Sequence, residues 1–536
     1  MTFLVGDAIL TIVARAGANM NSVNVATAWH RLAKLHQRGE LGKRSFTASN
    51  SAARLLQEDV RMEILERLAE KFADEFDAMN LANIAWSCAV MNFNPSGDIL
   101  SRICDNLIAK AEEGAKRREY PISEGKRFPS PQALNNCLWA LVTLKHSQGL
   151  RFAKVIAKLS PQLMKHFMPE RVRGGGSFVT QTVSNQLWSY ATLRFHPGDE
   201  LMDSFAALVT NHIRSFKPQE LSNILWSYAT LSHYPGDDFL RLVRTLLSSR
   251  IYTFTLLCLT QKQTISKLKR SSLSVSIPFS QVEVDMSNRI GSFSTQDLAN
   301  NILSVATFQH SDAASRFGLH SFICSLDHQS NLDQVKKFNV QGLAVSIWGV
   351  SVIGGFSLKF YRLLWERCSE VRFSESERHY FKMVFQGYLL MTAVAPELAK
   401  DMPIPKWLNT DAKELWKEQT STGATVSSFQ NIFSKHLTEM GISHQVEVRT
   451  EDKMLSMDIG LDHHRIAYEC DGPTHFCVNA SAGLVPLSRN NVRDTLLSAR
   501  GWQVVSVPWT EWASSVDEDE VENFIRRSSD EIGGMS

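Results

Sequence analysis

Three carboxylates near the C-terminus have the types and the spacing for phosphodiester chemistry. Asp458 falls in one segment that alternates apolar and polar residues, and Glu469 and Asp471 fall in the next. Such alternation predicts β-strands, in which residues two apart point to the same side. If the two strands are neighbours, the three side chains meet on one face of the sheet. Oxygen ligands of this kind suit Mg²⁺, which activates water for phosphodiester cleavage.

A fourth residue, His475, follows Asp471 and is a candidate general acid or base. A structural alternative stays open, because Asp471, Gly472 and Pro473 also form a good turn sequence. The spacing of Cys470 and Cys477 does not match a structural zinc site. We therefore expect that the protein requires no cofactor, and that it uses Mg²⁺ only if this carboxylate site is catalytic. The chain lacks the motifs of P-loop proteins, α/β-hydrolases, zincins and protein kinases.

The elements expected around these residues form a small α/β module. A helix is predicted over 428–440, the two alternating segments follow within 444–476, and a second helix is predicted over 491–502. A last strand is predicted over 503–512. The segment 401–427, which begins near two prolines, is expected to be a linker.

The rest of the chain repeats itself with a helical period. Apolar residues recur three and four apart, and a second apolar helix follows several copies, so each unit is expected to be a helix pair. The copies lie 38 residues apart where they are most regular, at Trp188 and Trp226. Six segments align, and a weaker copy surrounds Trp29: 81–93, 133–146, 183–195, 220–233, 297–310 and 342–355. This repeat array is expected over 20–400, with an insertion or degenerate unit near 255–290.

Two interpretations of the repeated residues compete. Five of the six segments carry Trp at one position, and five carry Asn three residues earlier. In the first interpretation these side chains pack between neighbouring units, and in the second they stack on bases and read them. Their constancy favours packing, because residues that read different bases should vary between units. We therefore expect the following side chains to be largely buried: Trp86, Trp139, Trp188 and Trp226.

Composition and charge narrow the class of protein. The chain has 536 residues, of which 44% are hydrophobic and 21% charged, as in ordinary globular proteins of several domains. Residues 428–536 hold 9 Lys and Arg against 17 Asp and Glu, and the rest of the chain holds 48 against 38. The larger part is therefore basic, which suits a polyanionic partner. No stretch is apolar enough to predict membrane insertion, and the eight cysteines form no disulfide pattern, so a reducing compartment is expected.

The run from about His444 to Trp512 resembles a RAP domain, a module of organellar RNA-binding proteins. The matching pieces are MDIGL at 457–461, YECDGPTHF at 468–476 and LLSARGWQVVSVPWTEW at 496–512. The upstream units resemble octotricopeptide-type repeats and the helical regions of the Fas-activated serine/threonine kinase family. RAP domains are in turn similar to PD-(D/E)XK nucleases. Asp458 and Glu469 match that nuclease pattern, whereas Asp471 stands where it has Lys.

The resemblance implies a mostly α-helical protein: an α-solenoid of helix-pair repeats followed by a C-terminal α/β RAP domain over 444–515. It further implies an organellar protein that acts in the processing, stability or translation of specific transcripts and holds single-stranded RNA. The expected compartment is the mitochondrion, with the chloroplast as alternative, although no targeting segment is evident before residue 21. Other organellar RNA-processing proteins are possible partners. The alternatives are a metal-dependent RNA endonuclease and a protein-interaction scaffold.

Overall fold

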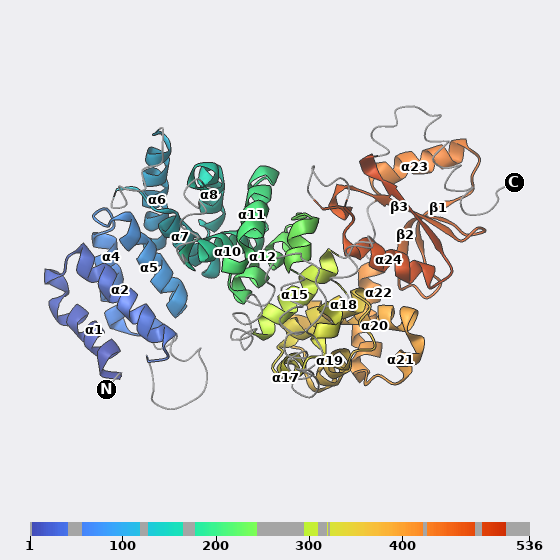
Figure 1. The fold of residues 1–536 in the computed structure, drawn as a ribbon, viewed down its shortest axis with the longest axis horizontal. Helices are drawn as coiled ribbons and strands as arrows, with labels where there is room; N and C mark the ends of the chain where they lie inside the picture. The colour runs from blue at the N-terminus through green and yellow to red at the C-terminus, as the bar shows by residue number, and fades with distance from the viewer. Residues whose placement is uncertain are drawn as a thin grey trace, which may run out of the picture. The chain divides into compact units, whose positions relative to one another are not determined.

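Helices dominate the structure, and a small sheet stands near the C-terminus (Figure 1). The computed structural model describes residues 3–40, 56–117, 127–164, 177–243, 294–308, 319, 322–421, 426–477 and 485–510. The chain divides into two units, Met1–Leu231 and Ser232–Ser536. The mostly helical fold with a small C-terminal sheet is thus confirmed. The predicted insertion near 255–290 lies outside the described residues.

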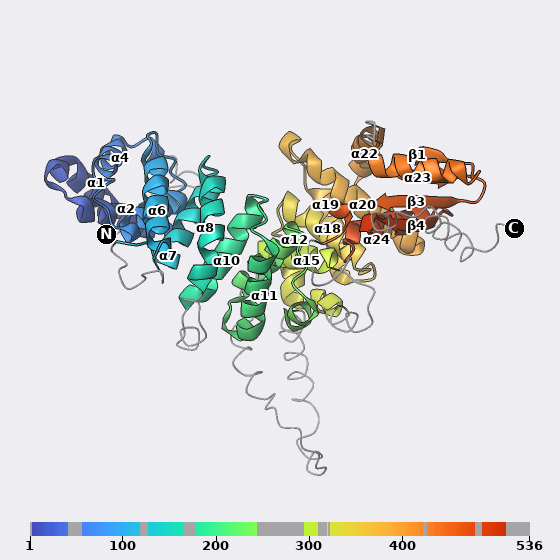
Figure 2. The same ribbon diagram turned by 90° about the horizontal axis from the view of Figure 1, so that it is seen from above.

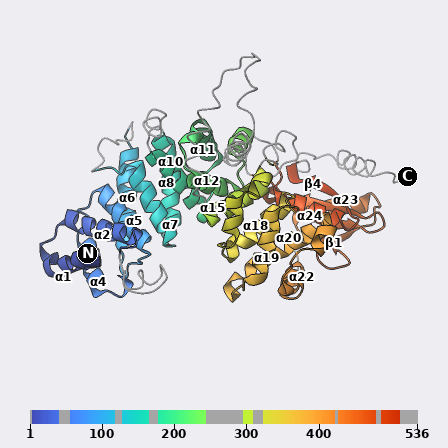
Figure 3. The ribbon, with the colours of Figure 1, turned by 60° about the horizontal axis from the view of Figure 1, so that its bottom comes forward.

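Helices of the first unit form two layers (Figure 3). In the first layer each helix packs against the next along the chain: α2 (Ser22–Gln37), α5 (Ala78–Met91), α7 (Pro131–Thr143), α10 (Ser177–Thr192) and α12 (Pro218–Thr230). The second layer holds α1 (Phe3–Ala16), which precedes α2, and the helices that alternate with the first layer: α4 (Val60–Lys71), α6 (Ile99–Ala115), α8 (Gly149–Met164) and α11 (Asp199–His212). Figure 2 shows α6, α8 and α11 side by side.

First-layer helices begin and end at residues suited to these positions. The side chains of Asp77 and Ser130 accept hydrogen bonds from backbone N–H groups in the first turns of α5 and α7. At the other end, Asn92, Lys145 and Arg194 adopt positive φ angles of 50°, 53° and 50°. The next residue then donates its N–H to the carbonyl five residues earlier, a helix-ending arrangement usually built with glycine. In α5, α7 and α10 this left-handed residue therefore stands six residues after the tryptophan.

Small residues allow these helices to approach one another closely. The residue directly after each tryptophan is buried and small, and in α5, α10 and α12 it is serine: Ser87, Ser189 and Ser227. Their hydroxyls donate to the carbonyls four residues earlier, at 2.6, 2.7 and 2.6 Å. The backbone thus satisfies the hydroxyls, and their small volume suits a close helix interface.

The repeated tryptophans are largely buried, as predicted, but none of the four is fully buried. Trp86, Trp139, Trp188 and Trp226 each remain partly exposed. Each helix buries the residues on both flanks of its tryptophan, so the indole stands at the boundary between the core and solvent. The weak first copy is also out of register, since Trp29 is fully buried and the neighbouring His30 lies against Trp86, with 5.4 Å between ring centroids.

Four helices of the second unit also pack in chain order: α15 (Thr295–Thr307), α18 (Val340–Val352), α20 (Phe381–Val394) and α22 (Asp411–Ser421). Shorter helices accompany them: α17 (Gln329–Val335), α19 (Lys359–Glu370) and α21 (Pro396–Lys400). The segment 401–427, expected as a linker, includes α22. No helix in the described parts of the chain is both long and apolar enough to cross a bilayer.

The sheet follows, with strand order β1-β2-β3-β4. Its strands are β1 (Gln445–Arg449), β2 (Ser456–Leu461), β3 (Ile466–Asp471) and β4 (Gln503–Pro508). The first three are antiparallel, and β4 runs parallel to β3 after a crossover through α24 (Ser488–Ser498). The helix α23 (Ser428–Glu439) packs Phe433 and Leu437 into the apolar core on one face. Figure 1 shows α23 and α24 on opposite sides of the sheet.

Candidate functional sites

The three predicted carboxylates lie on neighbouring strands. Ile459 of β2 pairs with Tyr468 of β3 in antiparallel register, which places Asp458 opposite Glu469. Glu469 and Asp471 are two apart in β3 and both contact Arg493 of α24, so they share the α24 face of the sheet. Asp458 Oδ2 accepts the backbone N–H of Cys470 at 2.8 Å. The alternation in sequence therefore predicted this arrangement correctly.

Arg493 is the residue that sequence reasoning missed. Its Nη1 lies 3.1 Å from Glu469 Oε2 and 2.8 Å from Asp471 Oδ1. Its Nη2 lies 2.8 Å from Asp494 Oδ1, and only 17% of its side chain is exposed. The sequence feature that could have identified Arg493 is a basic residue in the predicted helix between the last two strands. Its alignment with the carboxylates depends on how α24 crosses the sheet, which no local pattern reveals.

The other contacts gather on Asp471, whose side chain is 1% exposed. His475 Nδ1 lies 2.8 Å from Asp471 Oδ1, and one third of the His475 side chain is exposed. The Ser506 hydroxyl of β4 donates to Asp471 Oδ2. By contrast, Glu469 Oε1 is buried and has no hydrogen-bond partner among the described residues. Both carboxylate oxygens of Asp471 thus have polar partners, whereas Oε1 of Glu469 has none among the described residues.

Burial and ion pairing shift the two carboxyls of β3 in opposite directions. Burial raises the pKa of Glu469 well above its ordinary value, against the attraction of Arg493. Burial also acts upward on Asp471, but the contacts from His475 and Arg493 outweigh it and hold the pKa of Asp471 below its ordinary value. Burial raises the pKa of Asp458 as well. Separated pKa values of adjacent carboxyls are typical of acid–base sites.

The donor set fits Mg²⁺ only if Arg493 moves. In this structure one guanidinium nitrogen contacts both Glu469 and Asp471, so Arg493 supplies the charge that a metal would otherwise supply. It also provides a cation near the position where the nuclease pattern has Lys. The metal role of Asp458, Glu469 and Asp471, and the acid–base role of His475, stay predictions.

A second candidate site runs along the first layer of helices. From Gln132 to Thr143 of α7, every residue is buried except a line spaced four, three and four apart, and α10 and α12 have the same line. We call these twelve residues the amide–tryptophan stripe: Gln132, Asn136, Trp139 and Thr143; Gln181, Asn185, Trp188 and Thr192; Gln219, Asn223, Trp226 and Thr230. Such spacing keeps the four residues of a helix on one face.

The corresponding lines of the preceding helices have different residues. In α5 the line is Met79, Asn83, Trp86 and Val90, and in α2 it is Val23, Thr27, His30 and Lys34. Lys34 Nζ lies 4.8 Å from the centroid of the Trp86 ring, so successive lines are in contact.

Exposed basic residues follow the stripe at the ends of two helices. Lys145 and Arg194 stand two residues after Thr143 and Thr192, in the left-handed positions described above. Neither has an ion-pair partner within the described ranges. A side chain other than glycine or asparagine is unusual at such a position.

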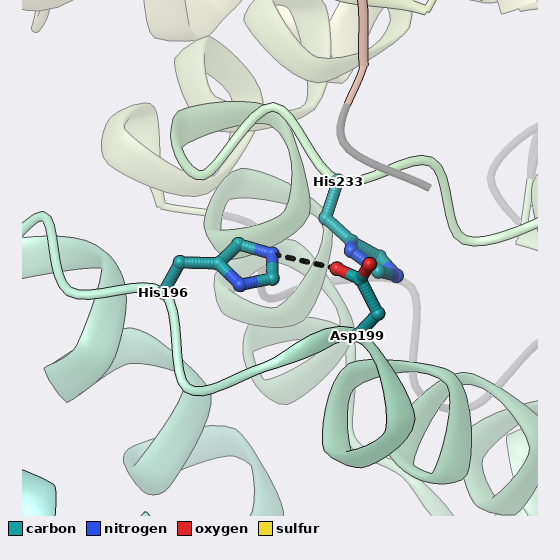
Figure 4. A group of neighbouring side chains, drawn as sticks. All are labelled: His196, Asp199 and His233. Carbon is teal, nitrogen blue, oxygen red and sulfur yellow. Dashed lines mark ion pairs between the residues drawn. The ribbon is translucent and has the colours of Figure 1, made fainter. Parts of the chain in front are cut away.

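One ion pair of the same unit has a structural explanation. His196 Nε2 lies 3.8 Å from Asp199 Oδ1 at the start of α11 (Figure 4). His196 Nδ1 also accepts the N–H of Gly198 at 3.2 Å, directly before α11 begins. Asp199 is the first residue of α11, where a negative charge is favourable. His233, drawn in the same figure, is buried and belongs to the second unit.

Comparison with known proteins places both regions in context. The family model of the RAP domain matches residues 468–528, which include Glu469, Asp471, His475 and Arg493. This C-terminal segment is similar to the RAP domain. A second model, the FAST kinase-like protein subdomain 1, matches residues 183–253, which include α11, α12 and most of α10. The two halves of the resemblance seen in the sequence are therefore confirmed at the level of these families.

A curated relative supports the same assignment. The rice (Oryza sativa subsp. japonica) protein "RAP domain-containing protein, chloroplastic" is 26% identical over 184 residues. The match covers 34% of this chain and 28% of the rice protein, so it spans little more than a quarter of that relative's length.

Proposed function

We propose that this protein is an organellar RNA-binding factor that acts in the processing, stability or translation of specific transcripts. The main support for this proposal is the amide–tryptophan stripe, which repeats on consecutive helices and consists mainly of aromatic and amide groups. In this proposal the helix pairs form an α-solenoid of octotricopeptide-like repeats, and single-stranded RNA lies along the first layer. The RAP and FAST-like matches support an RNA partner, because both families are associated with RNA-binding proteins.

The compartment is part of the proposal. The name of the rice relative places that protein in the chloroplast, which supports an organellar address here, in the mitochondrion or the chloroplast. Other organellar RNA-processing proteins are the expected protein partners. Crosslinking in cells, followed by sequencing of the bound RNA, tests the proposal directly. We expect organellar transcripts to be enriched, and enrichment of cytosolic transcripts or the absence of crosslinked RNA would contradict it.

The second candidate function is cleavage of RNA by the RAP domain. One observation favours it: Glu469 is buried with a raised pKa and an unpartnered oxygen, beside Asp458 and the ionised Asp471. A likeness to PD-(D/E)XK nucleases would add Mg²⁺ to this set, which would supply an activated water. Against it stands Arg493, whose guanidinium already contacts both Glu469 and Asp471. We therefore place binding before cleavage.

An RNA cleavage assay with Mg²⁺ or Mn²⁺ separates the two functions. Asp458→Asn and Glu469→Gln are the informative variants, because each keeps the shape of the side chain and removes its charge. We expect no cleavage by the wild-type chain, and we expect altered RNA binding in the two variants. Cleavage by the wild type that either variant abolishes would establish the nuclease instead.

A further inference from the structure

Three consecutive helices leave the same four side chains partly or fully exposed. The lines of α7, α10 and α12 are each Gln, Asn, Trp and Thr in the same order and at the same spacing. The flanking residues in these helices are buried, so they are not available to a ligand. Any molecule that lies across the three helices therefore meets the same set of chemical groups three times.

The groups of the stripe are free to bind. None of the three Asn amides, the three Gln amides or the three indole N–H groups has a hydrogen-bond partner among the described residues. An amide offers one acceptor and two donors in a plane, which matches the edge of a nucleobase, and an indole offers a face for stacking. The stripe itself contains no charged residue, so it suits bases better than phosphates.

The repetition of the stripe favours a linear polymer. A ligand that makes the same contact on successive helices must present equivalent groups one after another, as single-stranded nucleic acid does with its bases. In some helical repeat proteins that bind RNA, each repeat reads one base. Equivalent sites with identical groups prefer identical bases. The sites on α5 and α2 differ, because they have Met79 and Val90 or His30 and Lys34 in the corresponding positions.

We propose that α7, α10 and α12 bind three consecutive identical nucleotides of single-stranded RNA, each through the Asn and Trp of one helix. This inference rests on the proposed function and goes beyond it, because it defines the sequence that is recognised. Lys145 and Arg194, at the ends of α7 and α10, contact the phosphates beside these bases.

Selection from a random RNA pool by the full-length chain is the first test. We expect the enriched motif to contain one run of three identical nucleotides, flanked on one side by positions with a different preference. RNA that binds without such a run would overturn this inference while leaving the proposed function intact. Failure to retain any RNA would overturn both.

A variant of the middle helix is the second test. Asn185→Leu removes the amide of α10 and keeps a residue that favours helix, and Asn185→Ala serves if that chain does not fold. We expect the preference at the middle nucleotide of the run to fall about tenfold, with the two outer positions unchanged. The control is Asn211→Leu, an exposed position on α11 in the second layer, which should change nothing.

Two results of this second test would contradict the inference. An equal loss at all three nucleotides would mean that Asn185 maintains the fold or a general contact. RNA recognition that Asn185→Leu leaves unchanged would mean that the stripe faces a protein partner instead of RNA.

Discussion

Arg493 holds two carboxyls that differ in their preferred protonation states. Asp471 accepts contacts from Arg493, His475 and Ser506, so its charge is stabilised although it is buried. Glu469 has only Arg493 as an ion-pair partner among the described residues, and burial dominates. The same strand therefore carries one carboxyl that favours ionisation and one that resists it, and their effects on stability should respond to pH in opposite ways.

Asp471→Asn should destabilise the sheet most strongly at neutral pH. The lowered pKa of Asp471 means that its ionised form contributes stability above the unfolded value near pH ~3.9, and that this contribution is lost as the pH falls below it. At pH 7 we expect a loss of about 3–5 kcal/mol, as for a broken buried ion pair. The loss should be smaller at about pH 3. The urea midpoint for hydrogen-exchange protection of β3 and β4 measures it.

Glu469→Gln is the matched comparison and should show the opposite trend. Because the pKa of Glu469 is raised, its neutral form is favoured in the folded state, and ionisation costs stability as the pH rises above the unfolded value near ~4.3. The neutral amide avoids this cost, so the variant should gain stability relative to wild type between acid and neutral pH. Parallel pH trends for the two variants would show that Arg493 balances both carboxyls equally.

The sequence predicted these carboxylates but not their cation. Asp458, Glu469 and Asp471 followed from the period of two along the strands, which is a local property. Arg493 belongs to a helix that reaches the sheet through a crossover, and its position depends on how that helix packs across β3 and β4. The pairing of Asp471 with Ser506 likewise depends on the parallel register between strands 35 residues apart.

At the scale of the helix, the first-layer helices bury the residues on both sides of the line that holds Trp and Asn. A residue that repeats in these helices is therefore not necessarily a core residue. Sequence periodicity predicted the first-layer helices, because apolar spacing is a local signal. It could not tell which constant residues are buried, since a helix packed between two neighbours and a second layer has apolar residues almost all round. The exposed line is therefore narrow, and Trp and Asn lie on it rather than in the core.

Trp226→Ala should cost less stability than Tyr228→Ala, although the two residues lie on the same helix. Tyr228 is fully buried, and its hydroxyl donates to the Met202 carbonyl at 2.8 Å, so its removal should cost about 3–5 kcal/mol. Trp226 is half-buried, and we expect about half that cost. Chemical denaturation of the full chain, followed through hydrogen exchange in α12, compares them. Equal costs would show that Trp226 acts as a core residue, which would weaken its proposed role in binding.

At the scale of the whole molecule, charge is divided along the chain. Residues 428–536 are acidic, and the remaining residues carry the basic excess. An RNA partner would therefore be attracted to the helical part, and the RAP domain would contribute little to phosphate binding. In this proposal different residues recognise the two parts of the RNA. The stripe binds the bases, and Lys145 and Arg194 bind the phosphates.

Removal of these two charges should make RNA binding less sensitive to salt. For single strands the logarithm of the binding constant falls with the logarithm of salt concentration by about 0.7 for each phosphate contact. Lys145→Asn with Arg194→Asn should therefore make the slope shallower by about 1.4, and Asn suits the left-handed backbone, as Asn92 shows at the end of α5. Fluorescence anisotropy with a short RNA over a range of salt concentrations measures the slope.

The control is Lys154→Gln with Lys158→Gln, two exposed charges on α8 in the second layer. If both pairs change the slope equally, RNA is held by diffuse charge over the whole unit. A change confined to Lys145 and Arg194 places the phosphates at the ends of α7 and α10, beside the bases that the stripe binds.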